Sequence, residues 1–161
     1  MHIGGAHCKD VTIQVTEECN MACTYCYQGH KTCNSMDFDT AKKFIDWLLE
    51  GKDPYINADN SDGIILDFIG GEPFLKIGLI RKTAEYFVTR AFELHHRFAT
   101  RFMFSITSNG LLYFEPEVQE FFDEYQIHTS FSITIDGNKQ LHDTCRLDKG
   151  GYGTYDRAIA A

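Results

Sequence analysis

Three cysteines, Cys19, Cys23 and Cys26, lie close together near the start of this 161-residue chain. Their thiolates are soft ligands, which select zinc, copper(I) or an iron-sulfur cluster. A cubane cluster contains four irons, so a compact group of three cysteines can hold three of them and leave the fourth open. An open iron can bind a substrate or a cofactor.

A structural zinc site is the alternative use of these cysteines. It would take its fourth ligand from Cys33, His30, Cys8 or His7. Structural zinc sites, however, usually pair their ligands in two separated knuckles and close a tetrahedron, whereas this sequence has one compact group. The spacing therefore favours the cluster, and Cys8, Cys33 and Cys145 are left without a role.

The composition predicts one globular domain with a sizeable core, because 43% of the residues are hydrophobic and 14% aromatic. No apolar stretch approaches the roughly 20 residues of a membrane span, and the N-terminus lacks the features of an export signal. We therefore expect no membrane partner, a cytoplasmic location and reduced cysteines that are available to metals. A net charge of −8 without clustered Lys or Arg argues against nucleic acid and favours a protein, peptide or small-molecule substrate.

Strands and helices are predicted to alternate along the chain. Runs rich in β-branched and aromatic residues predict strands near residues 11–15, 64–69, 102–107 and 130–135. Helices are expected at 39–50, at 77–98, after Pro116 and from about Tyr155 onward, the first of them capped by Asp37 or Asp39. This βα order predicts an α/β fold with a parallel sheet, either doubly wound or part of a barrel wall.

Residues suited to ligand binding follow each predicted strand. The first strand leads into the cysteine loop, and the others lead into Gly70-Gly71-Glu72-Pro73, Ser108-Asn109-Gly110 and Asp136-Gly137. Each of these three motifs alone is an ordinary turn sequence. In parallel α/β sheets, however, ligands bind outside the carboxyl ends of the strands, so all four segments are expected on one face.

With these motifs, the chain resembles a radical S-adenosylmethionine (SAM) enzyme. The cysteine loop, with Tyr25 included, matches the family's CxxxCxΦC motif, and residues 70–73 match its GGEP motif. Further stretches resemble the SPASM-type subgroup, which includes anaerobic sulfatase-maturating enzymes and peptide maturases: Thr134-Ile135-Asp136-Gly137, His142-Asp143, Arg146 and Gly153-Thr154-Tyr155-Asp156.

The resemblance implies a fold and a domain organisation. Family members form a partial (βα)6 barrel, of which about four strands are readable here. Residues 1–161 would then be the N-terminal portion of a radical SAM core domain, without the last strands or any domain for auxiliary clusters. A portion of this kind is expected to bind SAM weakly and could be catalytically inactive on its own.

The resemblance also implies cofactors and a reaction. Cys19, Cys23 and Cys26 would hold a 4Fe-4S cluster, and SAM would bind the fourth iron. Reductive cleavage of SAM would give a 5'-deoxyadenosyl radical that abstracts hydrogen from a peptide or protein, leading to a thioether or other cross-link or to formylglycine. The expected partners are that substrate and an electron donor such as flavodoxin or ferredoxin. A non-catalytic, zinc-stabilised binding module is the alternative from another functional class.

By the same resemblance, nine residues are expected to bind SAM. Tyr25 would lie beside the adenine, while the backbone of Gly70 and Gly71 and the carboxylate of Glu72 would receive the methionyl amine. Arg146 would pair with a carboxylate of SAM or of the peptide. The remaining four offer polar groups to the ribose: Ser108, Asn109, Thr134 and Asp136. No residue is assigned as a catalytic acid or base, and no histidine is given a catalytic role.

Overall fold

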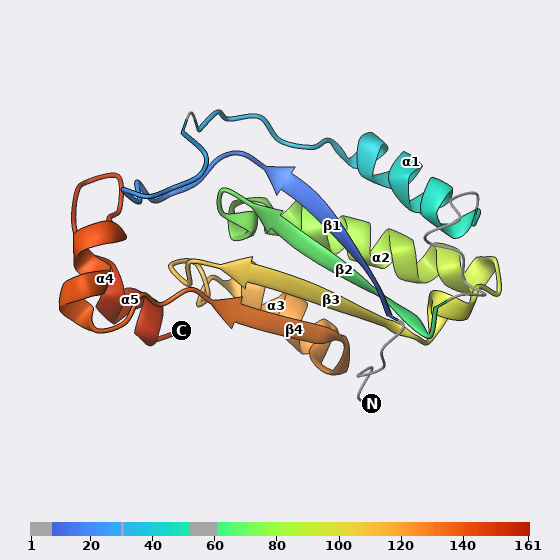
Figure 1. Ribbon diagram of the computed structural model, residues 1–161. Helices are drawn as coiled ribbons and strands as arrows, with labels where there is room; N and C mark the ends of the chain where they lie inside the picture. Colours follow the sequence, from blue (N-terminus) through green and yellow to red (C-terminus); the bar gives the residue numbers. More distant parts are fainter. Residues whose placement is uncertain (1–7, 30, 52–60) are drawn as a thin grey trace.

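The computed structural model describes residues 8–29, 31–51 and 61–161. In these ranges a parallel sheet has the order β1-β2-β3-β4, so each strand lies beside the next one along the chain. Its strands are β1 (Cys8–Thr16), β2 (Gly63–Gly70), β3 (Phe102–Ser108) and β4 (Thr129–Ile133). Figure 1 shows the four strands ending toward the same end of the molecule. The predicted parallel α/β fold is therefore confirmed.

Helices connect the strands. Three of them, α1 (Phe38–Leu49), α2 (Ile77–Glu93) and α3 (Pro116–Glu124), pack on one face of the sheet (Figure 1). Beyond the carboxyl ends of the strands lie α4 (Lys139–Cys145) and α5 (Tyr155–Ile159). Short 3-10 turns complete the connections: η2 (Pro73–Lys76), η3 (Arg97–Ala99) and η4 (Gln126–His128). None of the helices in these ranges is long and apolar enough to cross a membrane.

The helix boundaries follow local chemistry. Asp37 caps α1, because its side chain accepts a hydrogen bond from the Thr40 amide, and Pro116 stands in the first turn of α3. The predicted helix 77–98 is too long. It ends at Glu93, and the chain passes through His95, whose φ of 48° is not helical, before η3 begins.

The core lies between the sheet and α1 to α3. Alternate strand residues point into it, so Ile64, Leu66 and Phe68 of β2 are fully buried. Helix residues such as Ile45 and Phe87 meet them from the other side. The core is strongly aromatic, and Phe104 of β3 lies at its centre.

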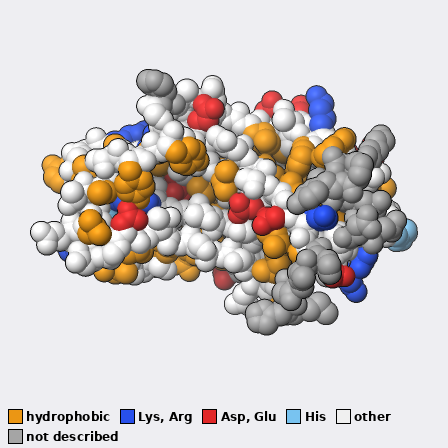
Figure 2. Space-filling model, in the orientation of Figure 1, with side chains coloured by type: hydrophobic (Ala, Val, Ile, Leu, Met, Phe, Trp, Pro, Cys, Tyr) orange, Lys and Arg blue, Asp and Glu red, His pale blue; other side chains and the backbone are white. Residues whose placement is uncertain are grey.

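The other face of the sheet has no helix over it in the described part of the chain (Figure 1). Here β1 exposes Asp10, Thr12 and Gln14, and β2 contributes the half-buried Asp67. Figure 2 shows acidic and hydrophobic side chains side by side on this face of the molecule. Among the described residues, helices therefore cover only one face of the sheet. The other face carries these polar side chains and extends to the carboxyl ends of the strands.

Replacing Phe104 by alanine should cost about 3 to 5 kcal/mol of unfolding free energy, because a fully buried ring is lost from the core. Its centroid lies 5.1 Å from those of Phe102 and Tyr125 and 6.0 Å from that of Phe68. Denaturant unfolding followed by circular dichroism measures the loss. Phe114→Ala is the control, since Phe114 is 64% exposed and its loss should change the stability by less than about 0.5 kcal/mol.

Candidate functional site

A cavity of about 500 Å³ opens at the carboxyl ends of the strands. It is lined by eleven of the twelve residues predicted for the site: Cys19, Cys23, Tyr25, Cys26, Gly70, Gly71, Glu72, Ser108, Asn109, Thr134 and Arg146. Asp136 is not in the lining, but its carboxylate contacts Tyr25. Five residues that were not predicted complete the wall: Met21, Tyr27, Lys31, Ile69 and Thr107. Segments far apart in the sequence thus share one cavity.

The cysteine loop after β1 has little regular structure and is held by its neighbours. On one side, the Gly71 amide donates to the carbonyl of Thr16 at 3.0 Å, and the Glu72 amide donates to that of Glu18 at 2.8 Å. On the other side, the amides of Ala22 and Thr24 donate to the carbonyls of Leu147 and Cys145, at 2.8 and 2.9 Å. The loop is therefore clamped between the end of β2 and the C-terminal end of α4 with the residues that follow it.

Close backbone packing explains the two glycines of the GGEP motif. A Cβ at Gly71 would lie 2.4 Å from the Glu18 carbonyl oxygen and 2.6 Å from that of Glu17. A Cβ at Gly70 would lie 2.7 Å from the carbonyl oxygen of Thr16. Both glycines are therefore needed for the approach of the cysteine loop, whatever ligand the cavity holds.

The Glu72 side chain is 1% exposed, and three donors of the chain itself surround its carboxylate. Oε1 accepts from the Ser108 hydroxyl at 2.8 Å and from the Phe74 amide at 3.1 Å, and Oε2 accepts from the Asn109 amide at 2.9 Å. Burial raises the pKa of this carboxyl, while the three hydrogen bonds act in the opposite direction. This geometry ties the end of β2 to the end of β3, a role that the sequence motif did not reveal.

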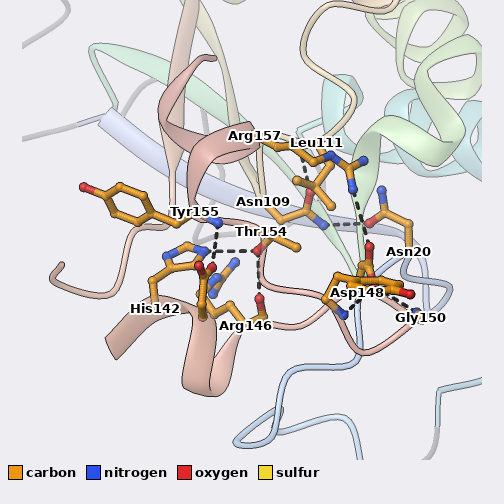
Figure 3. A network of polar contacts seen from close by, with 12 residues as sticks. Asn20, Asn109, Leu111, His142, Arg146, Asp148, Gly150, Thr154, Tyr155 and Arg157 are labelled. Atoms are coloured by element: carbon orange, nitrogen blue, oxygen red, sulfur yellow. Dashed lines mark hydrogen bonds and ion pairs between the residues drawn. The ribbon is translucent and has the colours of Figure 1, made fainter. Parts of the chain in front are cut away.

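The side-chain amide of Asn109 also forms its hydrogen bonds within the protein. Its Nδ2 donates to Oδ1 of Asn20 at 2.7 Å, and its Oδ1 accepts from the Leu111 amide at 3.0 Å (Figure 3). Cys19 is 6% exposed, and its sulfur accepts from the Met21 amide at 3.4 Å. Asn109 therefore supports the cysteine loop from the end of β3.

Tyr25 links the loop to the segments after β4. Its hydroxyl donates to Oδ2 of Asp136 at 2.5 Å and accepts from Nη1 of Arg146 at 2.8 Å. Partial burial and the hydrogen bond to Asp136 raise the pKa of Tyr25. Arg146 is 8% exposed, and its Nε has no partner among the described residues. A buried cation with a free donor thus borders the cavity.

The three thiols differ in their surroundings. Burial raises the pKa of Cys23, and the nearby cations Arg146 and Lys31 oppose this shift. Within the described ranges, no group of three or more His, Cys, Asp or Glu side chains is arranged to hold a metal ion. His7 and His30, two of the fourth ligands considered for zinc, lie outside these ranges. All three thiols line the cavity, and thiolates are the ligands that iron-sulfur clusters use.

His142 of α4 belongs to a chain of buried hydrogen bonds that was not predicted. This relay runs from the Asp136 amide through His142 and Thr154 to the carbonyl of Arg146, and Figure 3 shows its last two hydrogen bonds. Nδ1 of His142 accepts from the Asp136 amide at 3.3 Å, and Nε2 lies 3.1 Å from Oγ1 of Thr154. The Thr154 hydroxyl donates to the carbonyl of Arg146 at 2.8 Å. Burial and the nearby Arg146 lower the pKa of His142, which is 0% exposed. His142 therefore holds the segment after β4 from within the protein.

Gly71→Ala should destabilise the protein by about 1 to 3 kcal/mol, because its Cβ would collide with two backbone carbonyls of the cysteine loop. Gly78→Ala is the matched control. Gly78 lies in α2 with open space around it, so alanine should stabilise the helix by roughly 0.5 to 1 kcal/mol. Equal effects of the two substitutions on denaturant unfolding would contradict the tight packing at Gly71.

The contribution of His142 to stability should depend on pH. Because the folded state lowers its pKa, the unfolded chain takes up a proton first, and stability is lost as the pH falls below about 6.5. The destabilisation caused by His142→Gln should therefore be smaller near pH 5.5 than near pH 7.5, both values being approximate. Unfolding of the metal-free proteins at the two pH values measures this difference. A difference that stays constant or grows in acid would show that His142 is not held neutral.

Known proteins are similar to this chain in sequence. Residues 5–151 match the family model of the 4Fe-4S single cluster domain. An uncharacterized protein of Methanocaldococcus jannaschii is 35% identical, over 89% of this chain and 43% of its own length. The serine-type anaerobic sulfatase-maturating enzyme of Bacteroides thetaiotaomicron is 32% identical, over 88% of this chain and 32% of its own length. The chain thus spans less than half the length of these relatives.

A solved structure has the same fold. The structure of native anSMEcpe with bound AdoMet and the Cp18Cys peptide superposes with a TM-score of 0.73 at 20% identity, over 95% of this chain and 38% of that one. The two chains therefore share a fold over nearly all of this chain. The chain belongs to the 4Fe-4S single cluster domain family, and the resemblance of its sequence to radical SAM enzymes is confirmed.

Proposed function

We propose that this chain binds a 4Fe-4S cluster through Cys19, Cys23 and Cys26 and binds SAM at the remaining iron. The observation that carries the proposal is the shared cavity, which the three cysteines line together with Gly70 from the end of β2 and Arg146 from the end of α4. The family model supports the cluster, and AdoMet bound to anSMEcpe, which has the same fold, supports the second cofactor. When bound, the two cofactors supply one-electron cleavage of SAM and a carbon radical that removes a hydrogen atom from a substrate.

The residues of the chain hold and shield these groups. The cysteine loop is clamped on both sides, so its thiols are held before any ligand binds. Burial raises the pKa of Cys23, but the positive charges of Arg146 and Lys31 oppose this rise and favour the thiolate that a cluster needs. The free Nε donor of Arg146 suits the carboxylate of SAM or of a substrate.

The geometry narrows the roles that the sequence suggested for SAM binding. Since the Glu72 carboxylate and the Asn109 amide are engaged within the protein, we assign them to positioning the cavity wall. Gly70, Gly71 and Thr134 line the cavity and are the better candidates for direct contact with SAM. Tyr25 and Arg146 complete the proposed ligand set.

A peptide or protein is the proposed substrate, with side-chain cross-linking or formylglycine formation as the reaction. Sulfatase-maturating relatives and the Cp18Cys peptide bound to anSMEcpe support this class. The SPASM-type assignment, the flavodoxin or ferredoxin partner and the cytoplasmic location stay predictions of the sequence. So does the view that residues 1–161 are the N-terminal portion of a longer core domain.

Anaerobic reconstitution with iron and sulfide should load about four irons and four labile sulfides per chain and give a brown protein. Cys23→Ala should lose most of this content, because one of three thiolates is removed. Cys33→Ala is the control, since Cys33 is exposed and does not line the cavity. One tightly held zinc without labile sulfide would instead support the non-catalytic binding module.

A further inference from the structure

The two partners of the Tyr25 hydroxyl come from the chain segments on either side of α4. Asp136 follows β4, and Arg146 is the residue that caps the C-terminus of α4. They lie 111 and 121 residues from Tyr25 in the sequence. Tertiary contacts therefore set their positions relative to the cysteine loop, and for Arg146 these include the hydrogen bonds of the neighbouring Cys145 and Leu147 carbonyls to the loop.

The relay through His142 contacts both partners. Nδ1 of His142 accepts a hydrogen bond from the Asp136 amide. The Thr154 hydroxyl donates a hydrogen bond to the carbonyl of Arg146 (Figure 3). Because the Thr154 hydroxyl donates to Arg146, it cannot also donate to His142. The Thr154 oxygen must therefore accept a hydrogen bond from a protonated Nε2 of His142. One neutral tautomer, with the proton on Nε2, satisfies all three hydrogen bonds.

The relay is buried, and contacts between α4 and the turn that carries Thr154 hold it in place. His142 is 0% and Thr154 1% exposed, so a missing partner would leave a buried polar group unsatisfied. The turn that carries Thr154 is fastened to α4, because the Tyr155 amide donates to Oδ1 of Asp143 at 2.9 Å. A Cβ at Gly153 would lie 2.2 Å from Cγ of Asp143, so this contact is tight.

We propose that His142 and Thr154 are positioning residues that hold Asp136 and Arg146 in place to orient the Tyr25 hydroxyl at the cavity. Neither residue lines the cavity, so both act through the residues that they hold. The hydrogen-bonded arrangement stands on its own. Its consequence for SAM binding rests on the function proposed above.

A double-mutant cycle on the metal-free protein tests the connection to Tyr25. Thr154→Val removes the hydroxyl at nearly constant volume and should lower the Tm by about 3 to 8 °C, while Thr154→Ser should restore most of the loss. In the background of Tyr25→Phe, Thr154→Val should cost less Tm than it does in the wild-type protein. Losses that simply add would overturn the inference, because they would confine Thr154 to the packing of α4.

Affinity for SAM tests the consequence at the cavity. Cluster-loaded Thr154→Val with full iron and sulfide content should bind SAM roughly tenfold more weakly than wild type, with Thr154→Ser close to wild type. Unchanged affinity in fully loaded Thr154→Val would overturn the positioning role. If the wild-type protein takes up no cluster, the proposed function fails, and the Tm cycle still decides whether the relay reaches Tyr25.

Discussion

The cysteine loop keeps its shape through hydrogen bonds to segments that are distant in the sequence. Amides of Gly71 and Glu72 bind its first half, and carbonyls of Cys145 and Leu147 bind its second half. Without these contacts, a loop of this length would sample many conformations, and ordering it would cost conformational entropy. The positions of the three thiols therefore depend on the ends of β2 and α4 as much as on their own spacing.

Hydrogen bonds of buried polar groups also connect the strand ends to one another. Glu72 joins the ends of β2 and β3, and Asn109 joins β3 to the cysteine loop. His142 joins the segment after β4 to Arg146. Each group is satisfied by partners within the protein, and a buried polar group that loses its partner is costly. These hydrogen bonds therefore join the strand ends around the cavity into one connected unit, in which the buried Nε of Arg146 has no partner among the described residues.

Much of the fold and of the cavity lining could be predicted from the sequence, for physical reasons. Strands such as 64–69 are apolar runs between glycines, and the carboxyl ends of parallel strands must meet, so the motifs after them were bound to converge. Helix α4 was missed because seven residues with few apolar side chains give no clear periodicity. The burial of the Glu72 carboxylate among hydrogen-bond donors of the protein was missed, because burial depends on tertiary contacts. Asn138, which caps α4 with its side chain, was the available signal for that helix.

We propose that the protein fixes three irons of a bound cluster and leaves one for SAM. Mössbauer spectroscopy of the protein loaded with ⁵⁷Fe, with and without SAM, tests this most directly. We predict that SAM changes the signal of one iron of the four, in keeping with three cysteine ligands at the cavity. A spectrum that SAM leaves unchanged in a fully loaded protein, or four irons that stay equivalent with SAM bound, would contradict this ligation.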